Sequence, residues 1–206
     1  MDVWSRVVAL RTEIIDQLDG LPPDRWDAPT LCPGWRVRDV VAHLILPERM
    51  SSLAGLVAFA RTGFNIGRYL EADAVRRGSV PLEELIAAYR ESIGRRTLPP
   101  GRRPEHLLDD LFIHAQDIRR PLGLPCSGDE ALLTLVATTV AADRGLRAPG
   151  RIAGLRLRAL DIDWSSGSGD EVTGPAEALI LAMSGRDEVL PELSGSGLET
   201  LASRLS

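Results

Sequence analysis

The spacing of apolar residues predicts a largely helical N-terminal part. Over residues 3–18 the apolar side chains recur at intervals of three and four, as on a helix with one buried face, and Gly20 follows where such a helix would end. Pro47 lies within a second helical pattern, so we expect a kink or a loosened turn next to His43, whose carbonyl would lose its helical partner. Helices are predicted over residues 3–18, 36–61, 81–96, 104–120 and 128–144.

Two stretches between these helices are predicted to be loops. Four prolines lie among residues 21–35, which cannot continue a helix and indicate an ordered loop anchored by aromatic side chains. Residues 62–80 contain glycine, asparagine and arginine, and they predict a loop with room for one short helical stretch.

The hydrophobic period changes after residue 150. Residues 152–164 predict one or two strands, residues 165–171 (SSGSGDE) a tight turn, and residues 175–184 and 197–205 two short helices. We therefore expect a mainly α protein with a small α/β tail. Residues 1–149 would form an up-down four-helix bundle with an extra helix, and residues 150–206 a C-terminal domain packed on it.

Composition excludes several classes of protein. The 206 residues are 44% hydrophobic, enough for one sizeable core, and the net charge of -5 argues against nucleic acid as the main partner. No run approaches the roughly 18 apolar residues of a membrane span, and the charged N-terminus is unlike a secretory signal. We expect a cytoplasmic protein that does not act on membranes, and the use of arginine for all 24 cationic residues indicates GC-rich bacterial coding.

Cys32 and Cys126 are too few for a disulfide framework or a thiolate metal cluster, and we expect both to be reduced thiols. Cys32 lies in a proline-flanked segment without an adjacent histidine. A small buried side chain is therefore a simpler interpretation of Cys32 than a nucleophile.

The three histidines are the main candidates for chemistry. Asp110 precedes His114 by four residues, which places both side chains on one helix face, and His43 on another helix is expected to point inward. Such a set can hold a divalent metal and leave coordination positions open, although a solvated carboxylate with capping or core histidines produces the same spacing. His106 either substitutes for or supplements Asp110, or it is an exposed first-turn residue.

Three further residues are candidates for a supporting role. Asp39 either orients the His43 ring or simply favours the first turn of its helix through the macrodipole. Asp117 either orients His114 or pairs with a neighbouring arginine. Trp35 either anchors the loop before the second helix or lines a pocket over the metal.

Three segments together resemble the mycothiol-dependent maleylpyruvate isomerase family of the DinB-like superfamily. They are TLCPGWRVRDVVAHL (30–44), DLFIHAQDIRRPLG (110–123) and DIDWSSGSGDEVTGPAEALILAMSGR (161–186). The resemblance implies a DinB-like bundle followed by a small sterol-carrier-like α/β part. It also implies a divalent metal, most often zinc, on His43, Asp110 and His114. The isomerase pattern has Glu in place of Asp110, which leaves the metal's identity and affinity open.

The resemblance further implies an enzyme that uses mycothiol, the small thiol of high-GC actinobacteria, on a small electrophile. A metal would activate the thiol, so the resemblance implies no nucleophile from the chain itself. Reversible addition of the thiol to a double bond allows rotation in an isomerase, whereas the adduct is the product in a transferase. A non-catalytic protein that binds a metal or small ligand is the alternative, because fold does not determine function.

Overall fold

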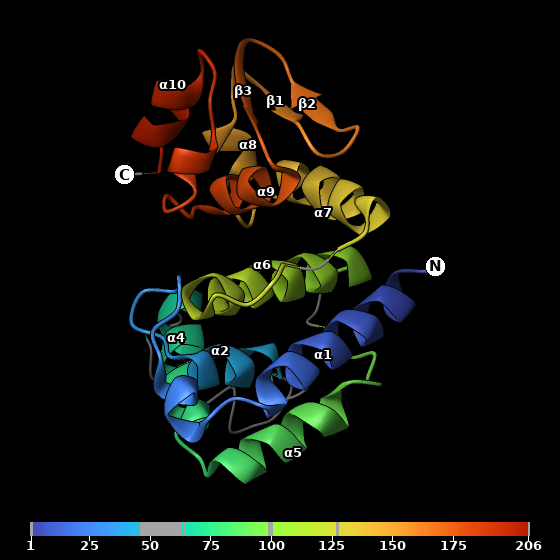
Figure 1. Ribbon diagram of the computed structural model, residues 1–206, viewed down its shortest axis with the longest axis vertical. Coiled ribbons are helices and arrows are strands. Elements are labelled where there is room, and N and C mark those ends of the chain that lie inside the picture. The colour runs from blue at the N-terminus through green and yellow to red at the C-terminus, as the bar shows by residue number, and fades with distance from the viewer. Residues whose placement is uncertain (1, 46–62, 64, 99–100, 127, 206) are drawn as a thin grey trace. The chain divides into compact units, whose positions relative to one another are not determined.

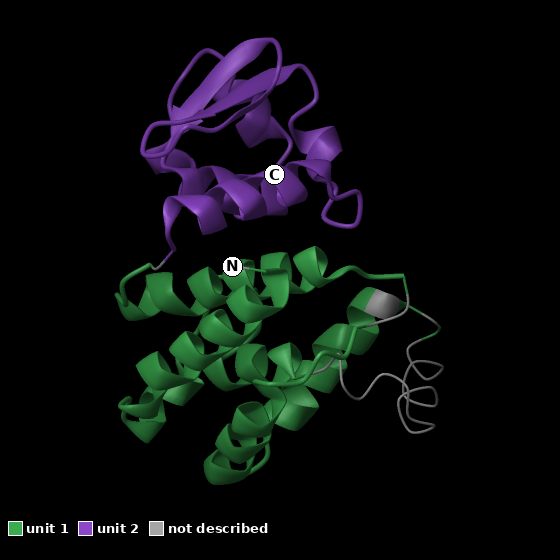
Figure 2. Cartoon of the chain, turned by 90° about the vertical axis from the view of Figure 1, so that its right-hand side faces the viewer, with its two compact units in different colours: residues 1–126 green, residues 127–206 purple. Residues whose placement is uncertain are grey.

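The computed structural model (Figure 1) divides into two compact units, residues 1–126 and residues 127–206 (Figure 2). Each unit is described by itself. The structure describes residues 2–45, 63, 65–98, 101–126 and 128–205.

The first unit is a helical bundle built from α1 (Val3–Asp19), α2 (Val37–Leu44), α5 (Leu82–Ser92) and α6 (Pro104–Leu122). Helices α1 and α2 each contact both α5 and α6, so the four helices close around one core. A fifth helix, α4 (Ile66–Gly78), packs against α2. The short 3-10 helix Pro23–Asp27 also contacts α2. The predicted bundle is thus present.

Helix α1 shows why the apolar spacing predicted this core. Val7, Leu10, Ile14 and Leu18 are all buried, and they recur along one face of the helix. Burial of one such side chain contributes roughly 1.5–3 kcal/mol. Asp2 caps the helix by accepting a hydrogen bond from the backbone N–H of Ser5. The structure therefore confirms the predicted helix and its buried face, and it adds the Asp2 cap.

The loop predicted over residues 62–80 is wrong for most of its length, because α4 occupies 13 of these residues. The Asn65 side chain caps α4 by accepting from the Arg68 N–H, and Tyr69 and Ala74 are buried. Few apolar residues mark this helix, so its apolar period is weak. The helix predicted over residues 36–61 is observed at Val37–Leu44, while Pro47 and its expected kink lie outside the described residues.

The second unit combines helices with a three-stranded sheet. The sheet order is β2-β1-β3, with β1 antiparallel to β2 and parallel to β3. Helix α9 contacts β1 and β3 as well as α7 and α8, which explains why nearly all of its residues are buried. The elements are α7 (Glu130–Ala142), α8 (Ala148–Arg151), β1 (Leu155–Ala159), β2 (Ser165–Gly167), β3 (Asp170–Gly174), α9 (Ala176–Ser184), the 3-10 helix Leu190–Glu192 and α10 (Leu198–Ser203).

The boundary between the units lies earlier than the expected division after residue 149. The structure divides the chain after Cys126, so α7 belongs to the second unit. Helix α7 buries Leu132, Val136 and Val140 and packs against α9. Its apolar face, predicted from the sequence to belong to the bundle, is thus part of the α/β core.

Two glycines allow the chain to cross from β2 to β3 past the start of β1. Gly167 and Gly169 have φ values of 79° and 118°, which L side chains rarely adopt. A Cβ at either position would also collide with a backbone carbonyl of the segment that leads into β1. The predicted turn at 165–171 therefore contains β2 and the start of β3, whereas residues 160–164, predicted as strand, form a bend in which Leu160 is exposed.

The fold class is mainly α with a small α/β part, as the sequence predicts. The described strands all belong to the one sheet of the second unit. Among the described helices, none is long and apolar enough to cross a membrane.

Candidate metal centre

Two helices of the first unit bring the three predicted ligands together. His43 lies in the last turn of α2, and Asp110 and His114 lie one turn apart on α6. The buried apolar face of α2 packs directly on α6. One donor atom from each of the three side chains lies within 4.8 Å of the other two.

The distances in this group suit a shared cation better than hydrogen bonds. His43 Nε2 lies 3.6 Å from Asp110 Oδ2, and His114 Nε2 lies 3.6 Å from Asp110 Oδ1. A normal N–H···O bond is about 2.7–3.2 Å long. Two atoms that each lie about 2.0–2.2 Å from one metal ion are separated by about 3.0–3.6 Å. Two imidazoles and a carboxylate are also donors that zinc accepts. The three residues therefore fit a divalent metal.

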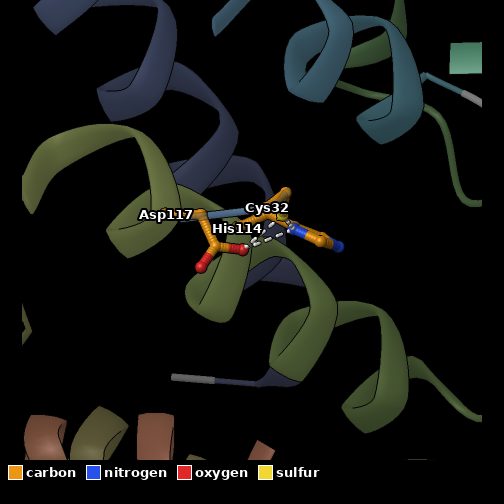
Figure 3. A group of neighbouring side chains, drawn as sticks. All are labelled: Cys32, His114 and Asp117. Atoms are coloured by element: carbon orange, nitrogen blue, oxygen red, sulfur yellow. Dashed lines mark hydrogen bonds and ion pairs between the residues drawn. The ribbon is translucent and has the colours of Figure 1, made fainter. Parts of the chain in front are cut away.

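A second group lies on the other side of the His114 ring. Figure 3 shows Cys32, His114 and Asp117 pointing toward one another. Asp117 Oδ2 lies 2.8 Å from His114 Nδ1 and accepts a hydrogen bond from Cys32 Sγ at 3.0 Å. The Cys32 sulfur lies 3.5 Å from the same Nδ1. The two contacts of Asp117 have the lengths of hydrogen bonds, so hydrogen bonds link these three side chains.

Asp117 determines which nitrogen of His114 faces the ligand group. An ionised carboxylate can only accept hydrogen bonds, so Nδ1 of His114 must carry a proton and donate a hydrogen bond to Asp117. Nε2 then faces Asp110, which is the arrangement of a metal-binding histidine held by a carboxylate. His43 differs, because its buried Nδ1 has no hydrogen-bond partner among the described residues.

The charges in the group shift two pKa values in opposite directions. Burial alone would lower the pKa of His114, but the hydrogen bonds to Asp117 and Cys32 and the charge of Asp110 raise that pKa to about 10. Burial would raise the pKa of Asp110, yet the contact with His43 and the charge of His114 hold it well below its usual range. Asp110 is therefore ionised at neutral pH, as a metal ligand must be.

Trp35 lies beside both imidazoles. Its ring centroid is 5.1 Å from that of His43 and 6.0 Å from that of His114, and the two imidazole centroids are 4.8 Å apart. The Asp110 side chain is 35% exposed, so the group is accessible at this carboxylate. Trp35 thus forms part of the surroundings of the ligand group.

Asp39 and His106 do not join this group. Asp39 accepts hydrogen bonds from the backbone N–H and the guanidinium of Arg36, so its described contacts cap α2 and do not orient His43. His106 Nδ1 accepts from the Arg103 N–H in the first turn of α6. Both side chains thus accept a hydrogen bond from the backbone N–H at the start of their own helix, a capping contact that was not predicted from the sequence for either residue.

Cys32 is the residue of the site that sequence reasoning missed. The chain places no histidine near Cys32, and only the packing of residues 30–35 against α6 brings its sulfur to His114 and Asp117. One signal was available in the sequence. Pro121 lies four residues after Asp117 and cannot donate to its carbonyl, which therefore needs a partner from elsewhere.

The fold and the ligand group define the class of protein. Two crystal structures, of the mycothiol-dependent maleylpyruvate isomerase and of a histidine-to-alanine mutant of it, match with a TM-score of 0.61 each. Each match covers 95% of this chain and 93% of the other, at 16% identity for the first and 15% for the mutant. At such identity the likeness shows the fold alone. This chain is accordingly a helical bundle protein with a C-terminal α/β unit, and it has the fold of those isomerase structures.

The family follows from the sequence of the first unit. Residues 7–103 match the family model of the mycothiol maleylpyruvate isomerase N-terminal domain. The N-terminal domain of this chain belongs to that family. The matched region includes His43 but ends before Asp110 and His114, whose place in the site rests on the geometry described above. No curated protein matches the sequence.

Proposed function

We propose that this protein is a metal-dependent, mycothiol-dependent transferase or isomerase that acts on a small electrophile. His43, Asp110 and His114 would hold the divalent metal, with zinc as the best fit to two imidazoles and one carboxylate. The convergence of these three side chains at separations suited to one ion carries the proposal. The family of the N-terminal domain supports mycothiol as the thiol.

A dication bound here would supply Lewis acidity, which favours the thiolate form of a coordinated thiol near neutral pH. The protein's own residues would hold and orient this centre. Asp117 keeps a proton on His114 Nδ1, so that Nε2 presents its lone pair to the ligand group. Trp35 packs beside both imidazoles and would limit the access of water to them, while the exposed edge of Asp110 leaves an approach for ligands.

The activity would be cytoplasmic, because a low-molecular-weight thiol cosubstrate stays reduced in that compartment.

Metal analysis is the first experiment. Wild-type protein should bind about one equivalent of zinc, and both His43→Ala and His114→Ala should lose it. His106→Ala is the matched control, because His106 accepts the Arg103 N–H in the first turn of α6 and is not among the three converging ligands, so its loss should leave the metal content unchanged. A full metal complement in either of the first two variants would exclude the proposed site.

A thiol assay separates catalysis from binding. Wild-type protein incubated with mycothiol and a panel of electrophiles, maleylpyruvate included, should consume the thiol or isomerise the electrophile faster than Asp110→Ala. Equal rates in the two proteins would leave a non-catalytic metal- or ligand-binding protein. Consumption of thiol would identify a transferase, and product formation without net thiol loss would identify an isomerase.

A further inference from the structure

The loop of residues 30–35 makes hydrogen bonds to both the backbone and the side chain of Asp117 on α6. Helix α6 continues through Pro121, which has no N–H to donate to the carbonyl four residues before it. That carbonyl belongs to Asp117, and the backbone N–H of Leu31 donates to it at 3.0 Å. Because of the proline, the carbonyl of Asp117 lacks its usual donor within the helix, and the Leu31 amide of the loop takes that place.

The side chain of Asp117 makes the second attachment. Its Oδ2 accepts from the Cys32 thiol at 3.0 Å and from His114 Nδ1 at 2.8 Å. The Asp117 side chain is 0% exposed, so water is not at hand to replace a lost donor. The loop is also hydrogen-bonded across itself at this point, because the Thr30 hydroxyl accepts from the Cys32 N–H and donates to the carbonyl of Trp35.

We propose that Cys32 is a positioning residue for His114, acting through the carboxylate of Asp117. The thiol donates a hydrogen bond to Oδ2 of Asp117, the same oxygen that accepts from His114 Nδ1. It thereby holds the carboxylate in the orientation that directs His114 Nε2 to the ligand group. The inference rests on the proposed function, because it takes His114 to be a metal ligand. It assigns to Cys32 neither coordination of the metal nor attack on a substrate.

The geometry separates Cys32 from the ligand group. The sulfur lies on the Nδ1 side of the His114 ring, whereas Nε2 on the opposite side faces Asp110. A metal held by Nε2 would therefore lie across the ring from the sulfur. The same attachment holds Trp35, three residues after Cys32, beside the two imidazoles.

Metal affinity tests this inference. Zinc affinity would be measured by competition with a chromophoric chelator in wild type, Cys32→Ala and Cys32→Ser, with Cys126→Ala as the control for loss of a thiol elsewhere. Each affinity would be corrected for the proton that zinc displaces from His114, so that variants in which His114 holds this proton differently are compared on the same basis. Loss of a partner behind a ligand typically weakens metal binding by about 10–100-fold, and we expect about tenfold for Cys32→Ala. Cys32→Ser keeps a donor and should restore most of the affinity. The control should match wild type.

Cobalt spectra provide a readout that a merely structural role would not move. Wild-type protein loaded with Co²⁺ should show no thiolate-to-cobalt charge-transfer absorption, and the ligand-field bands should shift in Cys32→Ala but not in Cys32→Ser. Charge-transfer absorption that Cys32→Ala removes would show that Cys32 is a ligand and would overturn the inference. Wild-type affinity in Cys32→Ala would also overturn it.

Two outcomes keep the test decisive. If Cys32→Ala does not fold, as judged by circular dichroism, Cys32→Ser decides alone: affinity near wild type supports the inference and a large loss overturns it. If instead wild type and His114→Ala bind zinc equally, the ligand set itself has failed. The proposed function and the role of Cys32 then fall together, an outcome distinct from loss of the Cys32 role alone.

Discussion

Zinc binding to this protein should tighten by about tenfold per pH unit between pH 7 and pH 9. The reason is the proton on Nε2 of His114. The buried Asp117 and the neighbouring Asp110 and Cys32 raise the pKa of His114 to about 10, so the imidazole carries protons on both nitrogens at pH 7. Nδ1 keeps its proton, which it donates in the hydrogen bond to Asp117. A bond from Nε2 to a metal therefore requires the proton on Nε2 to leave.

The sign and size follow from this competition. A raised pKa means that the metal-free protein holds the proton across the window from about 6.5 to about 10, so raising the pH within that window favours the metal-bound form. Three pH units lie between pH 7 and a pKa of about 10, and each is worth about 1.4 kcal/mol, so proton displacement costs about 4 kcal/mol at pH 7.

The assay is chelator competition at several pH values, corrected for the protonation of the chelator, together with calorimetry in buffers of different ionisation enthalpy. We expect about one proton released from His114 per zinc bound at pH 7. Asp117→Asn should flatten the dependence above pH 7, because it removes the carboxylate whose hydrogen bond raises the pKa of His114. If the zinc affinity of wild type is constant from pH 7 to pH 9, the metal-free protein does not carry a proton on His114 Nε2 and the reasoning is refuted.

Three further predictions concern the fold. Pro121→Ala supplies a helix N–H that competes with Leu31 for their shared acceptor, and hydrogen exchange at the Leu31 amide should accelerate by about tenfold while α6 stays helical. Leu179→Ala, in the buried helix α9, should destabilise the second unit by about 2–5 kcal/mol in denaturant unfolding and leave zinc affinity unchanged. Gly169→Ala should abolish cooperative unfolding of the second unit, since a Cβ there meets a backbone carbonyl, whereas Gly150→Ala, in open space, should be tolerated; thermal unfolding distinguishes them.

The helices that could be predicted are those with a strong apolar stripe. Helix α1 was found because its buried residues recur at the helical period, and α6 because Pro104 and Gly123 mark its ends. Helix α4 was missed since it buries few apolar side chains, and its stability depends on the Asn65 cap and on packing against α2. How far a strand extends also depends on the neighbouring strand with which it pairs. Residues 160–164, predicted as strand, therefore form a bend, because they do not pair in the sheet.

Local periodicity alone settled the relation between Asp110 and His114, because residues four apart on a helix always share a face. The inward direction of His43 followed in the same way from its apolar neighbours. Only the tertiary structure could bring Cys32 to Asp117, a partner 85 residues away. That contact depends on the docking of a proline-rich loop on the Asp117 carbonyl, which Pro121 leaves without its usual donor. The spacing of residues along the chain does not determine which loop binds there.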